Sequence, residues 1–186
     1  MAQPHPIATD LRSLPFQASI AISALPGNEP ALTDVLLLAH RFTADLAKGY
    51  TKLLGKTTEE NYAWLPPRGE PAGGGYSTVE DLIRFATALT GHKLLDEKHT
   101  ALLTTPKPGV PDQGYGYGFL LSREGSMRSF GRHGGGPGIN SDLKIIPDAG
   151  YVIAVMGNLD PPAALRVANF AAARLPLKKW PTRTRR

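Results

Sequence analysis

The residues best suited to chemistry lie together in one stretch, Ser129–Ser141, which reads Ser-Phe-Gly-Arg-His-Gly-Gly-Gly-Pro-Gly-Ile-Asn-Ser. His133 stands at its centre and is followed by Gly134, Gly135, Gly136 and Gly138. Glycine lets another group approach the main chain closely, and a neutral histidine can donate or accept a hydrogen bond. The stretch is therefore a candidate binding segment for a ligand or substrate. The alternative is a glycine-rich hairpin that carries one solvated histidine.

Composition excludes several other kinds of site. The 186 residues include no cysteine, which excludes a thiolate nucleophile, a disulfide framework and a cysteine-based zinc site. The five histidines show no metal-ligand spacing such as H-E-x-x-H, so we expect neither a metal nor another cofactor. His-Gly-Gly-Gly also begins the oxyanion loop of some α/β-hydrolases, but those enzymes need a G-x-S-x-G elbow that is absent here.

The charge is unevenly distributed. The formal net charge is +5, and five basic residues crowd the last nine positions: Lys178, Lys179, Arg183, Arg185 and Arg186. A basic terminus of this kind is more often a solvated tail than a nucleic-acid site, and the rest of the chain is close to neutral. We expect no nucleic-acid partner and no membrane span. Ala18–Leu25 lacks the flanks of a convincing signal peptide, which leaves the cytoplasm as the default location.

Two helices should precede the glycine-rich stretch. Ser77 and Glu80 have the spacing of a capping box, and apolar residues then recur at helical spacing as far as Gly91. Gly73–Gly75 could form an anion site before this helix, but no Lys-Ser/Thr pair follows to complete a phosphate loop. A shorter helix is expected from Asp96 to Leu103.

From Tyr115 onward the apolar period changes to two, which predicts strands at 115–122, 127–133, 139–146 and 151–157. The last of these is apolar on both faces and should be a buried inner strand. A helix at 163–175 closes the pattern. Helices followed by an antiparallel meander indicate an α+β fold, with an antiparallel sheet flanked by helices.

The remaining segments are less informative. Residues 1–44 contain several prolines and stay unassigned, apart from one helix expected from Thr33 to Ala47. Residues 48–72 read as a loop anchored by Tyr62 and Trp64. We therefore expect a domain at 45–175, followed by a basic tail at 176–186.

The order of these segments resembles the carboxy-terminal part of the serine β-lactamase and penicillin-binding-protein superfamily, most closely its class C β-lactamase, D-aminopeptidase and family VIII esterase branch. The resemblance rests on Ala72–Ala86, Tyr115–Phe119, His133–Gly138 and Asp142–Asn158, and it covers about Asp45–Leu175. It implies a partial β-lactamase/transpeptidase-like fold. It also implies a covalent serine mechanism acting on a small amide or ester substrate, in a family that is often exported.

The resemblance also implies roles for individual residues. His133-Gly134-Gly135 resembles the family's third motif, K-T-G or H-x-G, which suits His133 to a substrate carboxylate. By the same match Gly136 is the expected backbone donor to the oxyanion. Together, His133, Gly134, Gly135 and Gly136 would form the substrate-side wall of a catalytic cleft.

The family's catalytic residues have no counterpart in the expected places. The family carries S-x-x-K at a helix start far upstream, whereas the only match here, Ser141-Asp-Leu-Lys144, lies in a strand after the third motif. No Y-x-N occurs. We therefore identify no nucleophile or base and expect the isolated chain to be inactive unless an upstream segment or partner chain completes it. The alternative is a non-catalytic remnant or binding module. Exposed sheet and helix surface should also make the chain marginally stable or self-associating.

Overall fold

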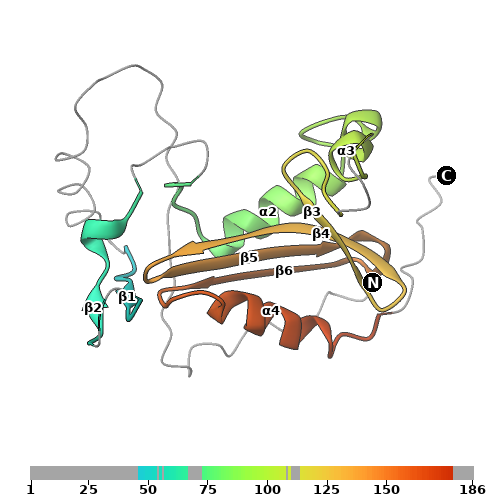
Figure 1. The fold of residues 1–186 in the computed structure, drawn as a ribbon. Coiled ribbons are helices and arrows are strands. Elements are labelled where there is room, and N and C mark those ends of the chain that lie inside the picture. Colours follow the sequence, from blue (N-terminus) through green and yellow to red (C-terminus); the bar gives the residue numbers. More distant parts are fainter. Residues whose placement is uncertain are drawn as a thin grey trace, which may run out of the picture.

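The computed structural model describes residues 46–53, 55, 57–66, 73–107, 109 and 114–177. A four-stranded antiparallel sheet forms the centre, with α2 (Val79–Thr90) and α3 (Glu97–Leu103) on one side and α4 (Ala163–Ala172) on the other (Figure 1). The predicted α+β class is confirmed. The expected helix at 33–47 falls almost entirely outside the described residues, as does most of the basic tail.

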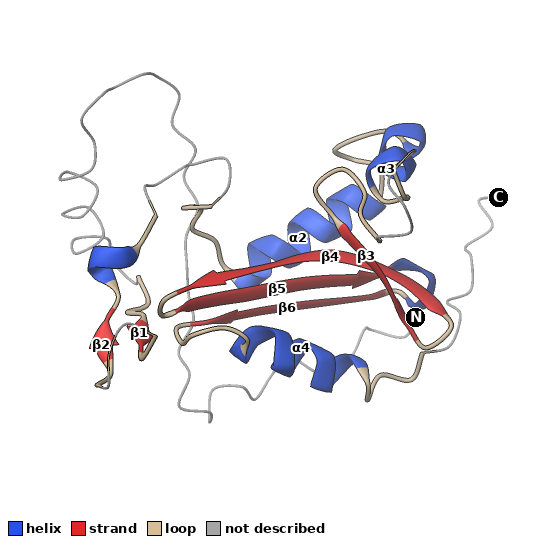
Figure 2. Ribbon diagram, viewed as in Figure 1, coloured by secondary structure: helices blue, strands red, loops and turns tan. Residues whose placement is uncertain are grey.

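The sheet has the strand order β3-β4-β5-β6, and every neighbouring pair is antiparallel. Its strands are β3 (Leu120–Glu124), β4 (Met127–Gly136), β5 (Ile139–Ile146) and β6 (Tyr151–Gly157). The three longer strands lie side by side while β3 turns away from them (Figure 2). The meander predicted from the period-two pattern is confirmed.

The first helix begins one residue later than the capping box predicted. Thr78 is the N-cap, and its hydroxyl accepts a hydrogen bond from the Asp81 backbone N–H at 3.1 Å. Ser77 is buried and donates instead to the Thr78 carbonyl. The predicted capping role of Ser77 is therefore wrong, because Thr78 is the residue with the extended backbone that an N-cap needs.

The two faces of the sheet are packed differently. On the α2 side, the Phe119 and Phe130 rings meet edge to face with centroids 5.4 Å apart. The cluster around them is apolar and consists of Ala86, Leu89, Phe119, Phe130, Leu143 and Ile145. On the other side, α4 buries Ala164, Ala168 and Ala172, which lie four residues apart on one stripe. These small side chains let α4 lie close to the strands.

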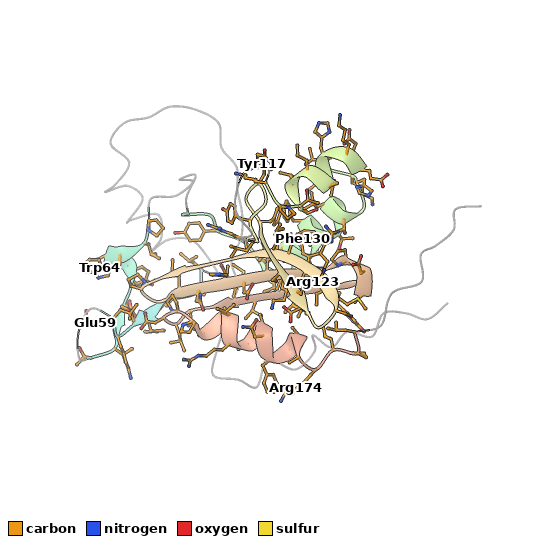
Figure 3. The ribbon with its side chains drawn as sticks, turned by 45° about the vertical axis from the view of Figure 1, so that its right-hand side comes forward. Glu59, Trp64, Tyr117, Arg123, Phe130 and Arg174 are labelled. Atoms are coloured by element: carbon orange, nitrogen blue, oxygen red, sulfur yellow. The ribbon has the colours of Figure 1, made fainter. Side chains whose placement is uncertain are left out.

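The predicted strand at 115–122 is wrong over its first half. β3 begins at Leu120, and Tyr115 contacts the sheet through an isolated bridge to Leu120 and through its hydroxyl, which accepts a hydrogen bond from Arg132 Nη1 at 3.1 Å. Between them the chain turns, with Gly118 at φ +86° and the Gly116 N–H donating to the Phe119 carbonyl at 2.8 Å. Tyr117 projects from this turn (Figure 3). Glycine at alternate positions imitates a strand pattern but here allows a tight reversal.

Within the described residues, the prediction that 151–157 is a buried inner strand is not met. Within the described part of the chain, β6 pairs only with β5 and forms the sheet edge. All seven of its residues are half-buried. The strand is apolar on both faces because α2 and α4 each contact it, one from either side.

A small hairpin lies beyond the end of the sheet. Its strands are β1 (Tyr50–Thr51) and β2 (Glu59–Glu60), followed by a short 3-10 helix at Tyr62–Trp64. Trp64 is 54% exposed and lies at the outer end of the molecule (Figure 3), so it does not anchor this segment as expected. The fully buried neighbour Asn61 takes that role.

Candidate functional site

The glycine-rich stretch lies in the part of β4 that is no longer paired with β3. β3 pairs with β4 only as far as Gly131, which lies opposite Leu120. β5 continues alongside to Gly136. Among the described residues, 132–136 therefore have a strand on one side only. The predicted turn at 133–138 is shorter than expected, because β4 continues through Gly136 and the reversal takes only Pro137 and Gly138.

His133 is exposed and lies opposite Asp142 on β5. Directly paired residues on neighbouring strands share a face of the sheet. An open groove of about 330 Å³ runs along this face, on the side of the sheet that α4 covers. Its lining includes His133, Asp142, Lys144, Glu124, Leu165 and Asn169. The structure thus places His133 beside a groove, on the α4 side of the sheet.

Two charged residues of the groove, Lys144 and Glu124, pair with each other, whereas Asp142 has no such partner. Lys144 Nζ lies 2.5 Å from Glu124 Oε1 and 2.8 Å from Asn169 Oδ1. Asp142 is only 3% exposed, and its Oδ2 has no hydrogen-bond partner. Burial raises the pKa of the Asp142 carboxyl, an effect that the charges of Lys144 and His133 partly oppose. The residue opposite His133 is thus a buried carboxyl whose pKa is raised.

The glycines beside His133 meet different surroundings. A Cβ added at Gly134 would have no atom within 4 Å, and one at Gly136 would make only ordinary contacts with Ile139. A Cβ at Gly135 would lie 2.6 Å from Pro161 and 2.8 Å from the Asn140 amide. Gly135 is therefore required by packing. Gly134 leaves an open surface that another molecule can approach.

A buried amide holds this part of the strand in place. Asn140 is 6% exposed, and its Nδ2 donates to the Gly134 carbonyl at 2.7 Å. Its Oδ1 accepts from the Ala164 N–H at 2.6 Å, at the start of α4. One side chain thus connects β4, β5 and α4. No local pattern indicates this role, because an asparagine after a glycine-rich stretch is also typical of a turn.

The turn after β4 is fixed by residues from distant parts of the chain. Asp160 accepts from the Gly138 N–H and from the Lys52 N–H, each at 2.8 Å. Asn61 Nδ2 donates to the Pro137 carbonyl at 2.9 Å. We call Asn61, Asp160 and the Pro137–Gly138 turn the turn clamp. Sequence reasoning missed it, since Asn61 is 76 residues from Pro137 along the chain.

The serine and the lysine of the S-x-x-K sequence of this chain point to opposite faces of the sheet. Ser141 and Lys144 both lie on β5, and residues three apart on a strand point to opposite faces. Lys144 is held by Glu124 and Asn169. In the described part of the chain, no serine hydroxyl is hydrogen-bonded to a histidine, lysine or carboxylate, and Ser122 and Ser129 bond to each other at 2.7 Å.

The described residues contain no group of three or more histidine, cysteine, aspartate or glutamate residues that could hold a metal ion. Within the same residues no helix has the length and apolarity to cross a membrane.

Comparisons with known proteins agree on one family. The Beta-lactamase family model matches residues 36–178. The penicillin binding protein from Bacillus halodurans is 30% identical, with a TM-score of 0.59, and the match covers 70% of this chain and 40% of that one. The D-amino acid amidase from Ochrobactrum anthropi SV3, complexed with D-phenylalanine, is 26% identical, with a TM-score of 0.51 and 69% and 43% covered.

A D-stereospecific amidohydrolase from Streptomyces sp. shares the fold at 22% identity, with a TM-score of 0.55 and coverage of 70% of this chain and 40% of that one. No curated protein sequence matches. The matched part of this chain corresponds to only 40% to 43% of the length of these three solved structures.

Proposed function

Because the chain belongs to the β-lactamase family, we propose that it forms the substrate-side wall of a serine hydrolase that cleaves amide or ester bonds. In this proposal the 186 residues bind and orient the substrate. The nucleophile and the base come from outside them, and the chain alone does not turn substrate over.

The observation that carries the proposal is the open edge of β4. Among the described residues, 132–136 pair only with β5, so an extended substrate can lie against the other edge and bond to the main chain. Gly134 faces the side of the sheet opposite to that of His133, and no atom lies within 4 Å of a Cβ added there, so a group of the substrate can lie over that face. His133 is exposed on the same segment and can donate a hydrogen bond to a substrate carboxylate.

Gly136 is the proposed backbone donor to the oxyanion. One such donor typically contributes about 10²–10³ in rate when a nucleophile is present. It contributes no turnover without one, because an acyl transfer by covalent catalysis has no first step in the absence of the nucleophile. The opposite orientations of Ser141 and Lys144 and the pairing of Lys144 support the view that these two do not act as nucleophile and base.

Among possible substrates we propose amides first. The relative that is 26% identical is a D-amino acid amidase bound to D-phenylalanine. A small amino-acid amide presents a carbonyl for the oxyanion donor and a short backbone for the β4 edge. Esters of the same shape would use the same wall.

The test is active-site labelling. The intact 186-residue chain is treated with a fluorophosphonate probe and, separately, with a labelled penicillin, and bound label is quantified by mass spectrometry. We expect no stoichiometric labelling. Stoichiometric labelling would overturn the proposal that the chain lacks a nucleophile, and it would identify the labelled serine.

Complementation tests the wall itself. The upstream part of the Bacillus halodurans penicillin binding protein is fused ahead of this chain, and labelling is repeated. We expect labelling of a serine in the added segment, weakened in the fusion by His133→Ala. The matched control is His99→Ala, which changes an exposed histidine on α3. A fusion that folds but is not labelled by the probe would contradict the proposal that this chain forms the substrate-side wall.

The second candidate function is a non-catalytic binding module. It is favoured because Lys144 is hydrogen-bonded to Glu124 and Asn169 and so is not free to act as a base. It differs from the first in one outcome. D-phenylalanine amide would then shift the NMR signals of 132–136 in the 186-residue chain, while the folded fusion would give neither labelling nor hydrolysis.

A further inference from the structure

Two cationic and two aromatic side chains gather at the point where β3 ends and the open edge of β4 begins. Tyr115 lies there through its bridge to Leu120, the first residue of β3. Arg132 Nη1 donates to the Tyr115 hydroxyl at 3.1 Å, and its guanidinium carbon lies 5.8 Å from the centre of the same ring. Lys107 Nζ lies 5.8 Å from the ring centre of Tyr115 and 4.4 Å from that of Tyr117. We call these four residues the basic-aromatic cluster: Lys107, Tyr115, Tyr117 and Arg132.

Arg132 and His133 lie on opposite faces of the sheet. Arg132 pairs with Leu143, which belongs to the apolar cluster on the α2 side. Gly134 follows two residues later on β4 and faces the same side, about 7 Å further along the strand. The open space over Gly134 therefore lies beside the Arg132 side chain.

The basic-aromatic cluster presents positive charge to solvent. Arg132 is exposed, and Tyr117 is 45% exposed and projects from its turn (Figure 3). In the part of the chain that the structure describes, neither Arg132 nor Lys107 forms an ion pair with a carboxylate. The tyrosine rings hold both cations in place without neutralising them. A guanidinium fixed in this way is suited to bind a carboxylate.

We propose that Arg132 determines the substrate specificity of the wall by binding an acidic side chain of the substrate, with Lys107 adding positive charge nearby. The inference rests on the proposed function, in which an extended substrate lies along the edge of β4. Successive side chains of an extended peptide point to opposite faces. A carboxylate at His133 and an acidic side chain at Arg132 can therefore belong to neighbouring positions of one substrate. The substrate class is an amide or ester that carries two carboxylates.

Tyr115 is the positioning residue in this proposal. Its hydroxyl accepts a hydrogen bond from the guanidinium, and its ring lies against the same group. An arginine side chain loses rotamer entropy when it binds a ligand, and a contact that already orders it reduces that loss. Tyr115 thus acts on the substrate through Arg132.

The experiment compares two dipeptides that differ only in charge, N-acetyl-D-glutamyl-D-phenylalanine and N-acetyl-D-glutaminyl-D-phenylalanine. Binding of each to the intact 186-residue chain is measured by NMR titration at two salt concentrations. The glutamyl peptide should bind about two- to fivefold more tightly, the range of an exposed ion pair, and the ratio should shrink at high salt. Equal affinities, or no binding of the glutamyl peptide, would overturn the proposal.

Substitutions locate the contact. Arg132→Gln should abolish the preference and leave the affinity for the glutaminyl peptide unchanged. Tyr115→Phe should reduce the preference by less, because the ring and both cations remain. The control Arg123→Gln changes an exposed arginine whose Nη1 donates to the Ser126 carbonyl in the β3–β4 turn, and it should keep the preference. A preference that survives Arg132→Gln would place the anion site elsewhere and refute the proposal.

The complemented fusion separates this inference from the proposed function. If the probes do not label the folded fusion, while the chain alone still shows a glutamyl preference that depends on Arg132, the serine-hydrolase wall is contradicted and the anion site stands. If the fusion is labelled but hydrolyses both dipeptides with the same kcat/KM, the wall stands and Arg132 has no role in specificity.

Discussion

Gly134 and Gly138 lie four residues apart in the same glycine-rich stretch, yet the fold requires glycine at only one of the two positions. Gly138 has a φ of +67°, and a Cβ added there would lie 2.8 Å from the Tyr50 nitrogen and 2.9 Å from Asn61. Gly134 has a φ outside the positive range and no atom within 4 Å of an added Cβ. The turn requires glycine at 138 for the fold, whereas the open edge leaves position 134 free of structural demands.

This difference separates binding from stability within one motif. Residues of the turn clamp hold the end of the hairpin, and their substitution should affect folding first. Residues at the β4 edge contribute little to the stability of the fold, so their substitution should affect binding first. Substitutions in the two regions should therefore give different measured effects, and the following predictions are ordered by expected size.

The largest effect is expected from Gly138→Ala. An L-residue at positive φ costs about 1–2 kcal/mol, and the contacts with Tyr50 and Asn61 add to that cost. We expect a loss of roughly 2–4 kcal/mol in the free energy of unfolding, within the range of strained substitutions. Urea denaturation followed by circular dichroism measures it. A loss below about 0.5 kcal/mol, the size of ordinary surface changes, would show that the turn is not held as described.

Asp160→Ala should cost somewhat less. It removes the acceptor of two backbone N–H groups, those of Gly138 and Lys52, for a loss of about 1–3 kcal/mol. Desolvation acts to raise the pKa of the Asp160 carboxyl. Hydrogen bonds from the Lys52 N–H, the Thr51 hydroxyl and the Gly138 N–H outweigh it and lower that pKa.

Asp160 therefore has a defined pH signature. A lowered folded-state pKa means that its contribution is present above the unfolded value of about 3.9 and is lost as pH falls through the folded value. Wild type and Asp160→Ala should converge in stability in acid, as measured by urea denaturation at a series of pH values. A gap that stays constant down to the lowest pH would contradict the charged-acceptor role.

Asp142 should show the opposite sign. Burial raises the pKa of its carboxyl, so the folded state favours the protonated form. Stability linked to this group falls as pH rises from about 3.9 through the raised folded value. Asp142→Asn, which imitates the protonated acid, should match wild type in acid and exceed it at neutral pH. An asparagine variant that is less stable than wild type at pH 7 would mean that the carboxylate has a partner.

Gly134→Ala should have the smallest effect on folding. The site has space for a methyl group, and alanine restricts the unfolded chain more than glycine does, so we expect a change within about 0.5 kcal/mol. In the complemented fusion the same substitution should weaken probe labelling, because the methyl group occupies the open space over the face of the sheet at Gly134. Labelling equal to that of the unsubstituted fusion would remove Gly134 from the proposed wall. Gly136→Ala, where an added Cβ makes only ordinary contacts, is the companion variant.

Local patterns in the sequence were enough to predict most elements. The apolar stripe of α2, the period-two alternation of β4 and β5 and the apolar run of β6 each reflect which side chains must be buried, and burial follows a fixed period along one element. The order of segments around His133–Gly138 likewise pointed to the family that the comparisons support. These signals are local in the chain, so one sequence contains them.

The tertiary structure decided what depends on neighbours distant in the chain. The turn at 115–119 and the half-buried β6 follow from which strands lie beside them, and no periodicity records that. The turn clamp joins Asn61 and Asp160 to Gly138 across long separations. The same holds for the buried carboxyl of Asp142, which lies between His133 of β4 and Val155 of β6. A sequence states which groups need partners, and only the folded chain determines which partners they meet.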